Sequence, residues 1–394
     1  MTSTDSTTAE PTTASWAAVC SLSLGILAIV MSEFLPASLL PRIAEDLDVS
    51  EGAAGQSVTV TAIAGAVSAL LIAVVLPRAD RRRVMLGLTV LAIMSDLLVA
   101  LAPDLVVLLG ARVLLGIALG GFWAMAAAMA AQLVPADRIG RALTVINAGV
   151  SVAAVVAVPL GAWLGDVWGW RGVFLLGAGI ALLALVVQAA TLPSVAAPVT
   201  GGLRVLASTL RSRTVVIGLV AVLLIFGGHF GGYTYIRPAT ESMTDIDAGG
   251  LAALLLVFGV ASVVGTMLSG PLADRALRVT VFLFPAAAAL GMLVMVGTSG
   301  STVGLYVAAV LWGFGFGGVP TAVLSWGART EPDRLEQIGG LIVTVCNIAI
   351  AVGAVVGGLL VDRSADSSPL LVGGIAVASG AVVIASLRTT RRVS

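Results

Sequence analysis

Four residues that can carry charge lie inside long apolar stretches of the sequence: Glu33, Asp96, Arg112 and His229. A charged side chain within a bilayer costs at least about 2.5–3.5 kcal/mol, so a chain that keeps such residues is expected to use them. A carboxyl group or an imidazole can release and regain a proton, whereas a guanidinium stays charged and tunes its neighbours. The four residues therefore predict proton coupling inside a membrane.

Simpler interpretations of the same residues stay open. Asp96 or Glu33 can form a static ion pair with Arg112, and His229 can donate a hydrogen bond between helices or contact a substrate. Counted along each helix at 1.5 Å per residue, all four lie about 9–12 Å below the same membrane surface. Glu33 also precedes His229 by 196 positions, the spacing of an internal repeat. We expect Glu33 to be the main proton carrier.

The composition requires a membrane around the elements that hold these residues. Of 394 residues, 59% are hydrophobic and 11% charged, with a mean hydropathy of +1.09, whereas soluble chains carry about a quarter charged residues. A soluble enzyme, a disordered chain and a collagen-like chain are excluded. The 21 arginines balance 21 acidic residues, so no basic excess is present to hold nucleic acid. Cys20 and Cys346 predict neither a disulfide framework nor a metal site.

Twelve apolar runs approach the length of about 20 residues that a membrane-spanning helix needs. They are residues 16–40, 52–76, 84–102, 105–133, 141–164, 172–191, 215–237, 250–272, 279–298, 303–327, 338–361 and 369–388. The first run follows a segment without Arg or Lys and exceeds a signal-peptide core, so it is expected to be a retained helix. We expect six-helix bundles at 16–192 and 215–388, a linker at 193–214, and tails at 1–15 and 389–394.

The arginines predict how the chain is oriented. Sixteen of them lie in segments on the side of the N-terminus, four lie on the opposite side, and Arg112 lies within a helix. Short loops rich in Arg stay in the cytoplasm. Both termini and the linker are therefore expected to be cytoplasmic.

The two halves of the chain contain an internal repeat at an offset of 194–197 positions. The matching segments are LLGIALGG (114–121) with LWGFGFGG (311–318), GAWLGD (161–166) with GGLLVD (357–362), and the Asp-Arg pair 80–81 with the pair 274–275. Three matches in the same order indicate a duplicated six-helix bundle. This is the usual construction of a secondary transporter, in which the substrate binds between the halves.

Several motifs resemble the major facilitator superfamily, drug:proton antiporter branch, and the resemblance extends over the whole chain. They are GPLADR (270–275), its degenerate counterpart LPRADRRR (76–83), GARVLLGIALGG (110–121), and PLGAWLGD with GWRGVF (159–174). The segments EFLPASLL, EGAAGQSVTVTA, LGGFWAM and TYIRP look most like the bacterial purine-ribonucleoside efflux pumps; arabinose and chloramphenicol exporters are the neighbouring groups. The resemblance implies an all-α membrane protein with twelve transmembrane helices in two pseudo-symmetric bundles, located in a bacterial inner (cytoplasmic) membrane.

In that superfamily helices 1, 4, 7 and 10 line a central cavity, and the resemblance places Glu33, Arg112 and His229 on three of them. Six further residues are expected to bind substrate: Trp123, Tyr233, Asn147, Trp312, Phe316 and Asn347. Aromatic faces with a few amides suit a flat polar heterocycle joined to a sugar, and Trp123 and Tyr233 are expected to face each other. Helix packing, or anchoring of Tyr233 at the membrane interface, is the alternative.

The repeated Asp-Arg pairs are expected to gate the cytoplasmic side by bridging helix ends in one state and parting in the other. These residues are Asp80, Arg81, Asp274 and Arg275. Solvated loop charge is the alternative interpretation.

Together these features predict a proton-driven exporter of a small polar molecule, a purine nucleoside such as inosine or guanosine, that works by alternating access. Drug or sugar export by the same fold is the nearest alternative; a channel or an intramembrane enzyme belongs to a different class. The sequence lacks the His and Cys spacings of a metalloenzyme and a GxSxG nucleophile motif, so no enzyme is expected. The coupling proton takes the place of a cofactor, and substrate and lipid bilayer are the expected partners of a monomer.

Overall fold

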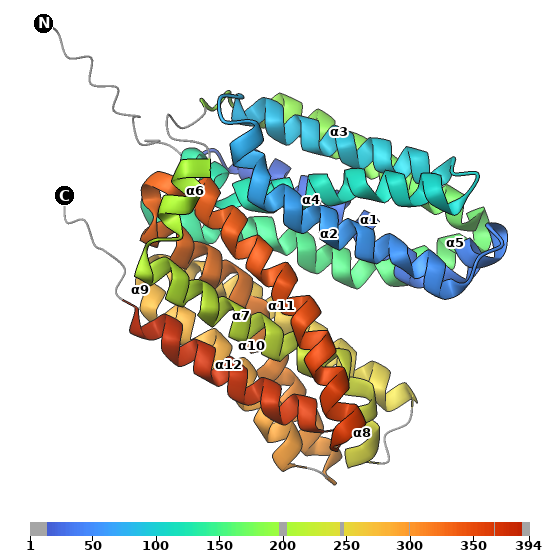
Figure 1. Ribbon diagram of the computed structural model, residues 1–394, viewed down its shortest axis with the longest axis vertical. Coiled ribbons are helices and arrows are strands. Elements are labelled where there is room, and N and C mark those ends of the chain that lie inside the picture. Colours follow the sequence, from blue (N-terminus) through green and yellow to red (C-terminus); the bar gives the residue numbers. More distant parts are fainter. Residues whose placement is uncertain (1–13, 197–202, 245–247, 299, 366, 388–394) are drawn as a thin grey trace, which may run out of the picture.

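The computed structural model describes residues 14–196, 203–244, 248–298, 300–365 and 367–387, and this part is almost entirely helical, without a β-strand (Figure 1). The α-helices are α1 (Trp16–Asp46), α2 (Glu51–Val75), α3 (Arg81–Ala100), α4 (Leu105–Leu133), α5 (Ile139–Thr191), α6 (Leu203–Thr209), α7 (Arg213–Thr234), α8 (Ile236–Met243), α9 (Ala248–Gly297), α10 (Thr302–Thr330), α11 (Leu335–Arg363) and α12 (Ser368–Ser386). Most of the predicted tails and residues 197–202 of the predicted linker lie outside the described residues.

Two of these helices each contain two membrane-spanning arms. In α5 the helix is interrupted at Gly169, whose φ of 69° is a left-handed conformation that glycine adopts without a Cβ clash. In α9 the interruption is at Ala276. Counting each arm separately, the described residues contain twelve long helices, and each overlaps one of the predicted apolar runs. The chain is therefore a multi-pass membrane protein with the expected fold class.

The helices form two bundles, the N-half (α1–α5) and the C-half (α7–α12), and close glycine contacts in both follow the sequence repeat (Figure 1). A Cβ added to Gly116 of α4 would collide with the carbonyl oxygen of Thr61 in α2. A Cβ added to Gly313 of α10 would collide with the carbonyl oxygen of Phe258 in α9. Both partners are shifted by 197 positions, so the duplicated glycines allow the same close helix approach in each half.

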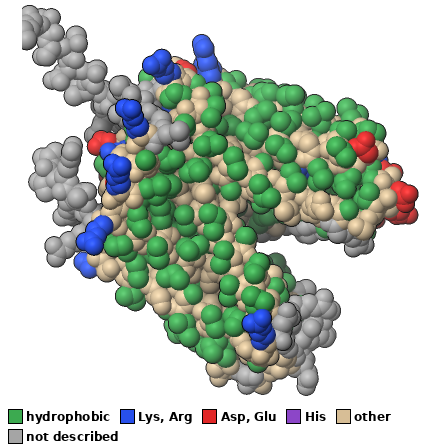
Figure 2. Space-filling model, viewed as in Figure 1, with side chains coloured by type: hydrophobic (Ala, Val, Ile, Leu, Met, Phe, Trp, Pro, Cys, Tyr) green, Lys and Arg blue, Asp and Glu red, His purple; other side chains and the backbone are tan. Residues whose placement is uncertain are grey.

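We call the end of the molecule where α1 begins and α12 ends the termini end, and the opposite end the far end. Polar and backbone contacts join the halves near the termini end, such as Thr144 Oγ1 to the carbonyl of Thr266 at 3.3 Å and Thr344 Oγ1 to the carbonyl of Ala66 at 3.2 Å. Towards the far end the two bundles diverge, and a cleft opens between them (Figure 2). The structure is thus closed at one end and open at the other.

Candidate functional site

A cavity lies between the halves. Its volume of about 280 Å³ is just below the range of about 300–1,000 Å³ that is typical of small-molecule sites. It is lined mainly by apolar and aromatic side chains from α1, α4, α5, α7, α10 and α11. Five residues singled out from the sequence belong to its wall: Glu33, Trp123, Asn147, Phe316 and Asn347. Tyr233 and Trp312 are not among the lining residues, so Trp123 and Tyr233 do not face each other across this cavity.

Three of the predicted ionisable residues meet in the N-half. Arg112 of α4 is fully buried, and its Nη1 donates to the carbonyl oxygen of Ser32 in α1 at 3.0 Å, while Nη2 lies 3.4 Å from the carbonyl oxygen of Glu33. Ser32 Oγ donates in turn to Asp96 Oδ1 on α3. Ser32, which the sequence did not single out, therefore connects the guanidinium to a buried carboxylate.

The two carboxylates of this cluster have different surroundings. Asp96 is fully buried away from the cavity. Its Oδ2 packs against Gly177 of α5, where an added Cβ would lie only 2.8 Å from this oxygen. Glu33 lines the cavity, and its carboxylate makes no hydrogen bond or ion pair to the part of the chain that the structure describes. Of these two carboxylates, Glu33 is the one that reaches the cavity.

His229 lies in the C-half, apart from this cluster, and is 2% exposed. Its Nδ1 accepts a hydrogen bond from Trp312 Nε1 at 3.0 Å, and its ring stacks on Phe316 with a centroid distance of 3.2 Å. Tyr233 stacks on the same imidazole at 5.5 Å. Tyr233, His229 and Trp312 thus form one aromatic cluster behind Phe316, which is the member that reaches the cavity.

The two predicted amides lie in opposite halves and face the cavity. Asn147 Nδ2 donates to the carbonyl of Leu143 at 2.8 Å and to Thr321 Oγ1 of the C-half at 3.1 Å. Asn347 Nδ2 donates to the carbonyl of Val343 at 2.9 Å. In both side chains the nitrogen has a partner within the protein, which leaves the amide oxygens available as acceptors for a bound molecule.

The termini end is closed by an ion pair between the halves. Arg81, at the start of α3, contacts Glu336 in the first turn of α11 through two hydrogen bonds, from Nε to Oε1 and from Nη2 to Oε2 at 2.6 Å. Both side chains are 3% exposed, and Arg81 Nη1 also donates to the carbonyls of Leu76 and Ala79. This bidentate geometry in a dry environment fixes α3 against α11.

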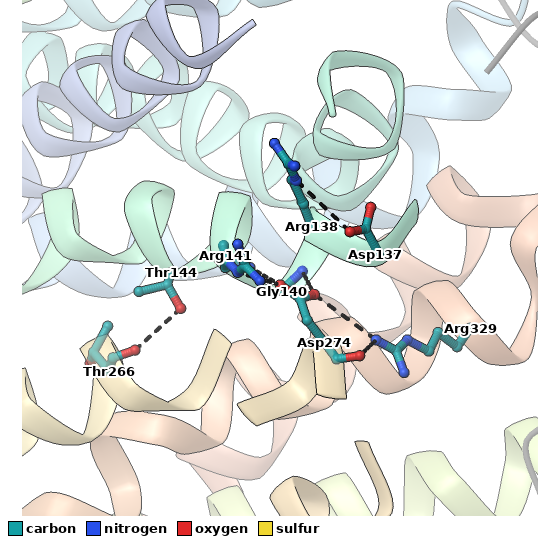
Figure 3. A network of polar contacts seen from close by, with 8 residues as sticks. All are labelled: Asp137, Arg138, Gly140, Arg141, Thr144, Thr266, Asp274 and Arg329. Atoms are coloured by element: carbon teal, nitrogen blue, oxygen red, sulfur yellow. Dashed lines mark hydrogen bonds and ion pairs between the residues drawn. The ribbon is translucent and has the colours of Figure 1, made fainter. Parts of the chain in front are cut away.

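A second contact closes the same end with the same polarity, a carboxylate of the C-half bound by donors of the N-half (Figure 3). Asp274 of α9 accepts hydrogen bonds from the backbone N–H groups of Gly140 at 2.6 Å and Arg141 at 3.0 Å, at the start of α5 in the N-half. The Arg141 and Arg329 guanidinium groups lie 3.5 and 3.9 Å from its carboxylate. A carboxylate at a helix N-terminus satisfies orphan donors and complements the helix dipole.

Of the four predicted gate residues, Arg81 and Asp274 bridge the halves, whereas Asp80 and Arg275 do not. Asp80 caps α3 by accepting from the N–H of Arg82 at 2.8 Å. Together with the Ser194 hydroxyl, which contributes most, this bond holds the pKa of Asp80 below its ordinary value. Arg275 is exposed and has no hydrogen bond or ion pair in the described chain.

Sequence reasoning missed the partners of this gate: Glu336, Gly140, Arg141 and Arg329. One signal was available for two of them, because Gly140 and Glu336 are 196 positions apart and occupy the same place at the starts of α5 and α11. The repeat thus marks both gate contacts, although the residue types at the matching positions differ.

Two related six-helix bundles with a cavity between them, closed at one end by inter-half contacts, define a secondary transporter. The chain belongs to the Major Facilitator Superfamily, whose profile matches residues 22–354. It is a membrane transporter and not an enzyme.

Two relatives and two solved structures illustrate the similarity. The chain is 38% identical to the purine ribonucleoside efflux pump NepI of Salmonella paratyphi B over 376 residues, 95% of each chain. It is 40% identical to the transcription regulatory protein OpdE of Pseudomonas aeruginosa over 354 residues, 89% of this chain and 88% of that one. The transporter FucP in the outward conformation superposes with a TM-score of 0.78 at 16% identity, over 95% and 99% of the two chains. The proton:xylose symporter XylE gives 0.76 at 16% identity over 93% and 94%.

Proposed function

We propose that this protein is a proton-coupled exporter of purine ribonucleosides such as inosine and guanosine. The observation that carries the proposal is the position of Glu33, a carboxylate in the cavity wall that accepts no hydrogen bond from the described residues and lies in front of the buried cation Arg112. A group of this kind can bind a proton from one side and release it to the other as the cavity changes its exposure. In this scheme Arg112 tunes the carboxylate and Asp96 compensates the guanidinium.

The substrate class follows from the lining of the cavity and from the relatives. Trp123 from the N-half and Phe316 from the C-half offer aromatic faces for a flat base. The amide oxygens of Asn147 and Asn347 can accept hydrogen bonds from a ring N–H or from ribose hydroxyls. The relative from Salmonella paratyphi B that aligns over 95% of both chains is named as a purine ribonucleoside efflux pump.

We place both termini in the cytoplasm of a bacterial cell, with the chain in the inner membrane. Most basic side chains visible in Figure 2 lie at the termini end, as the positive-inside rule requires of the cytoplasmic side. With that orientation the structure is closed to the cytoplasm and open to the outside. The proposed state is the one from which substrate leaves and a proton enters.

Export then requires the gate at the termini end to open after the proton has bound. Opening breaks the Arg81–Glu336 ion pair and the contact between Asp274 and α5. The cavity then takes up substrate from the cytoplasm. One proton moving inward across 100 mV supplies about 2.3 kcal/mol, enough for a roughly fifty-fold solute gradient. We propose that the monomer carries out this cycle without a cofactor.

The direct test is uptake of radiolabelled inosine into inverted membrane vesicles with an imposed pH gradient. We expect saturable, gradient-dependent accumulation that unlabelled guanosine reduces and that a protonophore abolishes. Competition by chloramphenicol-like compounds or sugars, with no competition by purines, would reassign the substrate within the same fold. Inosine movement that neither saturates nor depends on the pH gradient would indicate a channel instead.

A further inference from the structure

At the position equivalent to Glu33, the C-half carries His229, but the structure surrounds it differently. His229 is 2% exposed and does not line the cavity. The rings in contact with its imidazole come from α7, α9 and α10: Phe230, Tyr233, Phe258, Trp312 and Phe316. An ionisable residue is thus enclosed by aromatic side chains, and the activity described above leaves it without a role.

The hydrogen bond from Trp312 fixes the chemical state of this imidazole. The indole Nε1 of Trp312 is only a donor, so His229 Nδ1, 3.0 Å away, must be an acceptor without a proton. The remaining ring proton is therefore on Nε2, and the ring is neutral. A doubly protonated imidazole would direct a second N–H at the indole N–H, so that state and this contact exclude each other.

Trp312 is itself held in place. It is fully buried, and a Cβ added to Gly291 on the second arm of α9 would lie 2.7 Å from the Trp312 Cβ. The close approach of α9 leaves the indole little room to move. A fixed donor consequently determines which way the His229 ring is turned.

The other face of the imidazole supports the cavity wall. Phe316 stacks on His229 with an interplanar angle of 6°, and Phe230 packs edge-on against the same imidazole at 4.8 Å. Phe316 and Phe230 both line the cavity. The contacts therefore run from α9 through Trp312 and His229 to the two rings that a substrate would touch.

We propose that His229 is a positioning residue, held neutral by Trp312, which sets the plane of Phe316 for stacking against a planar aromatic heterocycle. This proposal rests on the proposed function for the identity of the substrate and assigns His229 no part in carrying the proton. Among the aromatic rings that contact the imidazole in the described part of the chain, Tyr233 is the titratable one. Glu33 of α1 and Cys346 of α11 are the titratable groups of the same cavity wall.

The first arm of the test needs no substrate. Protein labelled with nitrogen-15 in tryptophan is placed in nanodiscs, and the indole signal of Trp312 is assigned by its loss in Trp312→Phe. We expect this signal to keep its position between about pH 5.5 and 8.5, because the acceptor stays unprotonated. A signal that titrates together with the pH profile of transport would overturn the proposal and make His229 a proton carrier.

The second arm compares substitutions of His229 in which the new side chain places a polar atom where one of the two imidazole nitrogens was. The Oδ1 of Asn can occupy the place of His229 Nδ1 and accept from Trp312, whereas Gln reaches the place of Nε2. We expect His229→Asn to bind inosine within about threefold of wild type, and His229→Gln and Trp312→Phe to bind about tenfold more weakly, within the range of base–aromatic stacking. The pH dependence of transport should be unchanged in all three.

Equal inosine affinity in His229→Asn, His229→Gln and wild type would overturn the positioning role. Thermal unfolding in detergent shows whether each variant folds. If His229→Gln does not fold, the comparison of His229→Asn with Trp312→Phe still decides the test. If wild-type protein binds no inosine while the Trp312 signal stays constant with pH, the nucleoside assignment fails and the neutral His229 stands.

Discussion

The two walls of the cavity descend from one repeated bundle, yet they differ in chemistry. In the N-half, Glu33 faces the cavity, with Arg112 and Asp96 buried behind it in a network of charges. In the C-half, the equivalent residue His229 is enclosed by aromatic rings and bonded to Trp312. At this pair of equivalent positions the two halves therefore differ: charged side chains lie behind the N-half wall, and aromatic rings lie behind the C-half wall.

The largest effect is expected from Arg112→Gln, which leaves the N-half with two carboxylates and no cation to compensate them. Removal of one partner from a buried charge network costs about 3–5 kcal/mol, so the variant should lose much of its thermal stability and expression. The measurement is unfolding of the purified protein in detergent. The double variant Asp96→Asn with Arg112→Gln should recover part of the loss, and Arg83→Gln, an exposed arginine, should resemble wild type. Wild-type stability in Arg112→Gln would refute the charge network.

At the gate both halves carry charge, because the N-half contributes the cation Arg81 and the C-half the anions Glu336 and Asp274. Asp274→Asn weakens charge-assisted bonds to two helix N–H groups, worth about 1.5–3 kcal/mol, so the termini end should open at least tenfold more often. A cysteine at Thr266, in protein lacking Cys20 and Cys346, should then react correspondingly faster with a maleimide.

Arg275→Gln is the matched control for the gate, since it removes a neighbouring charge that bridges nothing in the described structure. It should leave the maleimide rate unchanged. Equal rates in Asp274→Asn and Arg275→Gln would favour the alternative interpretation, in which the repeated Asp-Arg pairs are solvated loop charge.

Trp123 tests whether the N-half also takes part in stacking. Trp123→Ala should weaken apparent inosine affinity by about 1–3 kcal/mol, roughly five- to 150-fold, and Trp123→Phe by less because a ring remains. Tyr233→Phe, which keeps its ring behind the cavity wall, should change affinity less than Trp123→Ala. Competition against labelled inosine in proteoliposomes gives these values. A loss for Tyr233→Phe larger than that for Trp123→Ala would assign the base to the C-half alone.

The smallest effect is expected at the far end, at an ion pair of the N-half whose two positions are not repeated as charges in the C-half. Asp46 bonds to Arg171, whereas the positions shifted by 196 in the C-half are Ser242 and Ser367. The guanidinium of Arg171 holds the pKa of Asp46 below its ordinary value, so the pair stabilises the fold above that value and is lost as the pH falls through the lowered pKa.

Since both side chains of this pair are partly exposed, Asp46→Asn should cost no more than about 1 kcal/mol at neutral pH. The difference from wild type in thermal unfolding should shrink below about pH 4. A difference that grows on acidification would contradict the sign of the shift.

The fold and the cavity helices could be predicted from the sequence because length, apolarity and the repeat are local or periodic properties. The charge of Glu33 within an apolar run marked it as a candidate for the cavity. The helical spacing of the aromatic residues did the same for Trp123 and Phe316, and all three line the wall. The rotation of each helix about its axis could not be predicted. In α7 it places His229 behind the ring of Phe316 and therefore out of the cavity wall. The gate partners were also beyond reach, because Arg81 and Glu336 are 255 positions apart and meet only through packing of the halves.

The central claim is that proton coupling resides in the N-half at Glu33. The measurement is labelled inosine movement in proteoliposomes, made in two modes, accumulation driven by a pH gradient and exchange at equal pH. Glu33→Gln should abolish accumulation and retain exchange, whereas Glu45→Gln, an exposed carboxylate on the same helix, should retain both. Gradient-driven accumulation at the wild-type level in Glu33→Gln would contradict the account.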